Sequence, residues 1–132
     1  MTVPRGDVVP GVTRYRSRIS TVELARRLVG AGWSVRVADL AGVESKADLL
    51  DAVASALEFP AWVGRNWDAL DDAMRDLSWW APGASGRALV LRGAERNAAR
   101  SPSEARVLRD VLEHAAPRWA GTATPLVVML RR

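Results

Sequence analysis

Four aspartates, Asp68, Asp71, Asp72 and Asp76, crowd a short stretch near the middle of this 132-residue chain. Asp68 and Asp72 are four positions apart, so on a helix their carboxylates would lie one turn apart on the same face. Like charges at this spacing repel by roughly 0.2–0.5 kcal/mol in an isolated helix. Carboxylates held in this way can bind cationic side chains or ligate Mg²⁺. A solvated helix face with an acidic first turn is the plain alternative.

The element that must position these acids is a helix that begins after Asn66, a favoured N-cap residue. At about 100° per residue, its apolar side chains fall within an arc of about 100°, which predicts the buried face. These side chains are Leu70, Ala73, Met74 and Leu77. Asp68, Asp71 and Asp72 lie on the opposite side, and Asp68 also sits in the first turn, where the helix dipole favours an anion.

The segment that leads into this helix is Phe59-Pro-Ala-Trp-Val-Gly-Arg65, which is more aromatic and more rigid than a plain surface helix needs. Gly64 allows a tight backbone turn just before the cap. Trp62 and Trp67 flank the acids, and tryptophan is enriched at protein interfaces. Ordinary core packing is the alternative for each tryptophan.

Charge is distributed unevenly along the chain. Between Glu44 and Trp80 there are eight acids and three bases, a net charge of −5, whereas the whole chain carries +4, so the remainder carries +9. A single acidic segment in a basic protein suits a cationic partner or a metal better than it suits RNA. Alternating Arg14, Arg16 and Arg18, followed by Arg26 and Arg27, make an arginine-rich RNA-binding surface an alternative, although we expect no direct nucleic-acid contact.

Several function classes are excluded by composition. The chain has no cysteine, so a disulfide framework, a zinc ribbon and a cysteine nucleophile are absent. The one histidine, His114, is interpreted as a surface or helix-end residue. No base, nucleophile or second acidic cluster accompanies the aspartates, so we expect no enzyme activity, cofactor or metal, with a Mg²⁺ enzyme as the alternative. No apolar run suits a membrane helix or signal peptide, so a cytoplasmic protein is expected.

Hydrophobic periodicity and capping residues predict seven elements in the order helix, strand, helix, helix, strand, helix, strand. The helices are expected to begin after Ser20, Ser45, Asn66 and Ser101, and the strands are expected at 33–37, 88–91 and 126–130. Ser101-Pro-Ser-Glu104 is the strongest capping signal. Residues 1–11 are predicted to be a loose tail. This alternation favours an α/β fold with parallel strands.

The segment Phe59–Asp72 resembles the signature of the barstar family, the intracellular inhibitors of barnase-like ribonucleases. The shared pattern is an apolar residue, Pro, any residue, an aromatic, any residue, Gly, any residue, Asn, a bulky residue, Asp, Ala, Leu, any residue and Asp. In element order the resemblance continues from about Trp33 to Arg132, and Asp76-Leu-Ser-Trp79 resembles the inhibitor-like proteins of high-GC bacteria.

The resemblance implies a barstar-like, three-layer α/β fold with a small three-stranded parallel sheet and flanking helices. Residues 1–32 would be an N-terminal extension, consisting of a tail and one helix, and residues 33–132 would be the barstar-like domain. It further implies an antitoxin- or immunity-type inhibitor that blocks the active site of a basic ribonuclease with an acidic helix whose carboxylates mimic substrate phosphate. We expect the free protein to be a monomer.

The resemblance also assigns site residues. The two inhibitory aspartates fall on Asp68 and Asp72, the contacting aromatic on Trp62, the capping amide on Asn66 and the bulky residue on Trp67. The expected partner-binding residues are therefore Trp62, Gly64, Asn66, Trp67, Asp68, Asp71 and Asp72. Asp71 stands where the family prototype has tryptophan, the prototype is acidic overall, and its late acidic contact has no match here. A toxin domain that is not a ribonuclease is therefore an alternative partner.

Overall fold

The computed structural model describes residues 11–15 and 17–132. In chain order the elements are β1 (Gly11–Arg14), α1 (Thr21–Gly30), β2 (Trp33–Asp39), α2 (Lys46–Ala56), α3 (Trp67–Asp76), β3 (Gly86–Arg92), α4 (Ala94–Arg100), α5 (Pro102–Ala120) and β4 (Leu126–Leu130). The strands form one parallel sheet in the order β1-β4-β3-β2. The mixed α/β class and the parallel sheet agree with the sequence prediction.

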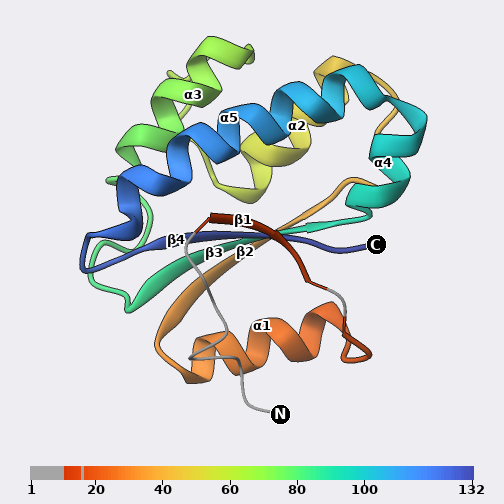
Figure 1. Ribbon diagram of the computed structural model, residues 1–132. Coiled ribbons are helices and arrows are strands. Elements are labelled where there is room, and N and C mark those ends of the chain that lie inside the picture. The colour runs from red at the N-terminus through yellow and green to blue at the C-terminus, as the bar shows by residue number, and fades with distance from the viewer. Residues whose placement is uncertain (1–10, 16) are drawn as a thin grey trace.

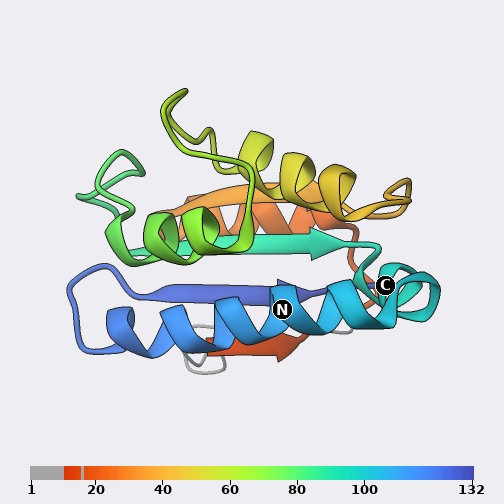
Figure 2. The ribbon, with the colours of Figure 1, turned by 90° about the horizontal axis from the view of Figure 1, so that it is seen from above.

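The sheet lies between two layers of helices (Figure 1). On one face α1 buries Leu24 and Leu28 against Ala88, Val90, Val127 and Met129 of the central strands. On the other face α2, α3 and α5 cover the alternate side chains of the same strands, including Leu89, Leu91 and Val128. Because both faces are covered, β3 and β4 are almost continuously apolar, as buried parallel strands usually are. Figure 2 shows α3 beside β3 and α5 running alongside β4 and β1.

The predicted three-stranded sheet is wrong, because the sheet has a fourth strand. Gly11–Arg14 pairs with β4 in parallel, with Gly11 opposite Val127 and Arg14 opposite Leu130. This four-residue edge strand has no alternating apolar pattern, so its pairing with β4, rather than local propensity, decides its conformation. The prediction of a tail therefore fails at Gly11, and the rest of the predicted tail, residues 1–10, lies outside the described residues.

The predicted cap at Ser101 does not form as expected. The sequence prediction had no helix before it, but α4 runs up to Arg100, and Ser101 is shared by α4 and α5. Its N–H donates to the Asn97 carbonyl at 2.8 Å, and its carbonyl accepts from the Ala105 N–H at 3.0 Å. With φ −138° and ψ 69°, its side chain makes no capping hydrogen bond.

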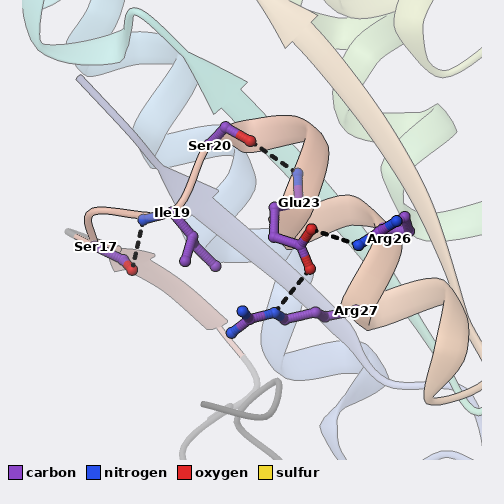
Figure 3. A network of polar contacts seen from close by, with 6 residues as sticks. All are labelled: Ser17, Ile19, Ser20, Glu23, Arg26 and Arg27. Carbon is purple, nitrogen blue, oxygen red and sulfur yellow. Dashed lines mark hydrogen bonds and ion pairs between the residues drawn. The ribbon is translucent and has the colours of Figure 1, made fainter.

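The predicted helix after Ser20 begins with one of the two hydrogen bonds of a capping box (Figure 3). The Ser20 hydroxyl oxygen accepts from the Glu23 N–H at 3.0 Å. The Glu23 carboxylate instead accepts from Arg27 Nε at 2.9 Å and from Arg26 Nη2 at 2.7 Å. The hydrogen bond from Arg27, supported by the two positive charges, lowers the pKa of Glu23 below its ordinary value of 4.5.

Within the described residues, no helix is both long enough and apolar enough to cross a membrane. β1 forms one edge of the sheet and α1 covers one of its faces, so both of these elements pack on the strands that follow them. The division of the chain into an extension at 1–32 and a domain at 33–132 stays a prediction.

Candidate functional site

Helix α3 begins where the sequence predicts. The Asn66 side chain accepts a hydrogen bond from the Ala69 N–H at 2.8 Å, which satisfies one of the amides that the first helical turn leaves unpaired. A Cβ on Gly64 would lie 3.1 Å from the Asn66 side-chain nitrogen. Glycine therefore leaves room for the Asn66 side chain at this position, and the φ of Gly64 lies outside the left-handed region.

The approach loop is fixed to the body of the protein at its start. Glu58 adopts φ 53°, and the Phe59 N–H closes the end of α2 on the Ala54 carbonyl at 3.0 Å, as in a Schellman motif. The Phe59 ring meets the Trp79 ring edge to face, with 5.7 Å between ring centres. The Trp79 indole N–H also donates to the Leu57 carbonyl at 3.1 Å.

The second half of the loop is held to α2 as well as to the core. Arg65 Nε lies 3.3 Å from the Asp51 carboxylate on α2, and Arg65 Nη1 donates to the Val63 carbonyl at 3.1 Å. Val63 itself is buried. The loop therefore reaches α3 in one defined conformation.

The far end of α3 is anchored by two side chains from other elements. The Trp119 indole N–H, on α5, donates to the Met74 carbonyl at 2.9 Å. Arg87, on β3, is only 3% exposed. Its Nη2 donates to the Leu77 carbonyl at 3.3 Å, and its Nε donates to the Trp80 carbonyl at 2.6 Å. Burial lowers the pKa of Arg87, and its charge faces the negative end of the helix dipole.

The inner and outer faces of α3 match the prediction. Leu70, Ala73 and Met74 are buried, as is Leu77 at the C-cap. Asp68 and Asp72 are exposed, and the Asp72 side chain is 81% accessible to solvent. Asp68 makes no ion pair with any residue that the structure describes, and Asp72 has only a distant one, 3.7 Å from Arg75 Nη2.

Asp71 differs from its neighbours because it is already neutralised. Its carboxylate accepts a hydrogen bond from Arg75, one turn later, and its side chain is 25% exposed. Asp71 also points about 60° away from Asp68 around the helix axis, on the side away from Asp72. Asp71 is therefore part of the acidic surface of α3, but its carboxylate is less available to a partner than those of Asp68 and Asp72.

A groove of about 320 Å³ lies between the approach loop and α3. Its lining includes Trp62, Gly64, Asp72 and Asp76. The Trp62 side chain is 76% exposed, so this indole is not a core residue. The groove therefore presents one indole and two carboxylates on a fixed backbone.

Asp76 was not among the expected binding residues, although the structure places it in the groove with Asp72. The spacing of Asp68, Asp72 and Asp76 at i, i+4 and i+8 was the available signal, because these three positions span about 80° of the helix. Trp67 is the opposite case. It is half-buried and packs against the main core, so it supports the helix that carries the site and does not present its indole as Trp62 does.

The acids of α3 are not arranged as a metal site. No group of three or more His, Cys, Asp or Glu residues that could hold a metal ion occurs among the described residues. Of the arginines of the alternative RNA-binding surface, Arg26 and Arg27 are paired with Glu23, and Arg16 lies outside the described residues.

The fold and site together define a parallel α/β domain that exposes an acidic helix held at both ends. The family model described as Barstar (barnase inhibitor) matches residues 33–131, three quarters of the chain. The chain therefore belongs to the barstar family. No curated protein matches the chain. Members of this family are inhibitors that act on a protein partner such as a ribonuclease, and they are not enzymes.

Proposed function

We propose that this protein inhibits a basic ribonuclease by placing the exposed face of α3 in the active site of the enzyme. The observation that carries this proposal is the pair of carboxylates on Asp68 and Asp72, which are exposed and free of a close counter-ion within the described residues. A ribonuclease site holds cationic side chains arranged to bind phosphate. A carboxylate there accepts the same charge-assisted hydrogen bonds.

The residues of the site have different roles in this proposal, and Asp71, which Arg75 neutralises, only adds to the acidic surface. Asp72 and Asp68 bind the cations of the enzyme, and Asp76 adds negative charge at the far end of the groove. The Trp62 indole covers apolar surface on the partner beside those charges. Asn66 fixes the start of the helix, Gly64 leaves room for the Asn66 side chain, and Trp67 secures the helix to the core.

Rigidity supports this role because ordering a flexible binding segment costs free energy on association. The α3 backbone is held by Asn66 at its start and by Trp119 and Arg87 at its end. The carboxylates therefore reach the partner on a backbone that is already ordered. The net charge of −5 between Glu44 and Trp80 also accelerates encounter with a basic enzyme, and this effect weakens as salt is added.

The proposal is tested by capturing partners from the source cell with the wild-type protein, with D68A/D72A and with the control D110A/E113A. Asp110 and Glu113 are exposed acids on α5, so the control removes the same charge elsewhere. We expect wild type and control to retain a basic ribonuclease and to block its cleavage of RNA, whereas D68A/D72A does neither.

Two results would contradict this proposal. Equal capture by all three baits would mean that α3 is not the binding face. Capture of a basic toxin domain without ribonuclease activity, lost only in D68A/D72A, would keep the acidic face but replace the ribonuclease as its target.

A further inference from the structure

A second hollow, of about 530 Å³, opens at the end of the sheet where β3 and β4 finish. Four of its lining residues are arginines: Arg18, Arg92, Arg131 and Arg132. The other described lining residues, Tyr15, Ser17 and Thr21, all carry hydroxyl groups, and none of the described lining residues is Asp or Glu. A cavity with this lining is complementary to an anion.

The topology explains why these residues meet. Arg92 is the last residue of β3, and Arg131 and Arg132 directly follow β4. Because the strands are parallel, the three arginines meet at the carboxyl ends of these strands. Ser17 and Arg18, which precede α1, also line the hollow, and the Ser17 carbonyl accepts a hydrogen bond from Arg131 Nη2. In open parallel α/β sheets, ligands bind outside the carboxyl ends of the strands.

One arginine of the hollow is held in a fixed orientation. Arg131 Nη2 donates to the Ser17 carbonyl at 3.2 Å and to the Ile19 carbonyl at 2.6 Å; Figure 3 shows how Ser17 and Ile19 lie before α1. Its guanidinium also lies 5.9 Å from the centre of the Tyr15 ring. Arg131 Nη1 is buried and finds no hydrogen-bond partner among the described residues. A buried donor without an acceptor costs free energy, which an anionic oxygen would recover.

The remaining positive charges of the hollow are weakly neutralised. Arg92 Nη1 lies 3.8 Å from the Asp39 carboxylate, and Arg132 Nε lies 4.0 Å from that of Glu95. These exposed pairs are long, and such pairs contribute little. Arg18 makes no ion pair with any residue in the described part of the chain.

We propose that this hollow, defined by Arg18, Arg92, Arg131 and Arg132, binds the phosphate group of a small phosphate monoester. Arginine presents a planar fork of N–H donors that matches phosphate oxygens in pairs, and several arginines around one anion match a dianion better than a monoanion. The hydroxyls of Ser17 and Thr21 supply further donors at the mouth of the hollow.

This second site is separate from the acidic face of α3. Arg87 contacts the end of α3 from the second position of β3, whereas Arg92 ends the same strand. Arg87 and Arg92 are five strand residues apart, roughly 16 Å at about 3.3 Å per residue, so the residue that anchors α3 and the hollow lie toward opposite ends of β3. The phosphate site therefore does not depend on the proposed inhibition and can fail independently of it.

The test is a residue-resolved NMR titration of the full chain with inorganic phosphate and with phenyl phosphate, with ionic strength held constant by chloride. We expect saturable shifts centred on Arg18, Arg92, Arg131 and Arg132. The R18Q/R132Q variant should bind both probes at least tenfold more weakly. The control R96Q/R106Q removes two exposed arginines outside the hollow and should bind like wild type.

Three results would overturn the phosphate site. Shifts that do not saturate, or that appear equally at all exposed arginines, would indicate general screening. Equal binding by R18Q/R132Q and wild type would place the anion elsewhere. Binding of a short single-stranded RNA but of neither phosphate probe would make these arginines a nucleic-acid surface instead.

Discussion

On α3 the guanidinium of Arg75 pairs with the carboxylate of Asp71, while Asp72, the next residue, stays 81% exposed and 3.7 Å from the same guanidinium. Two adjacent aspartates on one helix therefore have different electrostatic states. The first is neutralised within the chain, and the second is available to a partner.

This difference predicts unequal effects of two isosteric substitutions on inhibition. D72N removes a charge that becomes desolvated against a cation of the partner, and breaking such a pair costs about 3–5 kcal/mol, or at least a hundredfold in affinity. D71N removes a charge that Arg75 already neutralises, so we expect a change of less than about tenfold. Titration calorimetry with the captured partner measures both, and equal losses would contradict the assignment.

Substitution of Trp62 should separate binding from folding. Because its side chain is 76% exposed, W62A should leave the free energy of unfolding within about 0.5 kcal/mol of wild type. If the indole contacts the partner, the same variant should bind at least tenfold more weakly. W67A serves as the comparison, since Trp67 packs on the core and its loss should lower stability. An unchanged affinity of W62A would remove the indole from the interface.

The Asn66 cap should contribute to stability through its side-chain oxygen. N66A removes the acceptor of the Ala69 N–H, and loss of an N-cap typically costs about 1 kcal/mol of unfolding free energy. N66D keeps an acceptor at the same place and should retain most of the stability. Urea denaturation measures both, and an N66A variant as stable as wild type would show that the cap does not hold α3.

Arg87 should be the most sensitive charged residue of the fold. R87M leaves the Leu77 and Trp80 carbonyls without their buried donor, and unpaired buried groups cost about 1–3 kcal/mol each. We therefore expect a loss of about 3 kcal/mol or more in unfolding free energy. R92M, on the same strand but exposed, is the matched control and should change stability by less than about 0.5 kcal/mol.

Glu23 predicts a contribution to stability that depends on pH. Its pKa in the folded protein is lowered from 4.5, chiefly by the hydrogen bond from Arg27, so the unfolded state binds the proton more readily. The contribution is therefore complete above about pH 4.5 and is lost as the pH falls through the lower folded value. The difference in Tm between wild type and E23Q should be largest near pH 7 and should shrink on acidification. A difference that stays constant with pH would contradict this account.

Features set by local sequence were predictable. Asn66 capping α3 and the buried arc from Leu70 to Leu77 depend on residue type and spacing within one helix, and the structure confirms both. The acidic outer face followed from the same periodicity. The family signature lies in this segment as well, so the candidate site was predicted from the same residues as the helix, and its role in binding a partner stays a prediction.

Features set by contacts between distant segments were not predictable. β1 depends on pairing with β4, more than a hundred residues later in the chain. Arg87 lies in a strand that otherwise reads as apolar, and its role depends on carbonyls at Leu77, Trp80 and Thr124. The one residue that the short helix α4 buries is the polar Asn97. Its sequence therefore has almost no apolar periodicity from which a helix could be predicted.

The most direct test of the central claim is a kinetic measurement of RNA cleavage by the captured ribonuclease in the presence of this protein. If α3 occupies the phosphate-binding site, inhibition is competitive: the apparent inhibition constant rises in proportion to RNA concentration, and D72N loses at least a hundredfold in potency. Inhibition that is independent of RNA concentration and equally strong in D72N would contradict the account, because the carboxylates of α3 would then not compete with substrate phosphate.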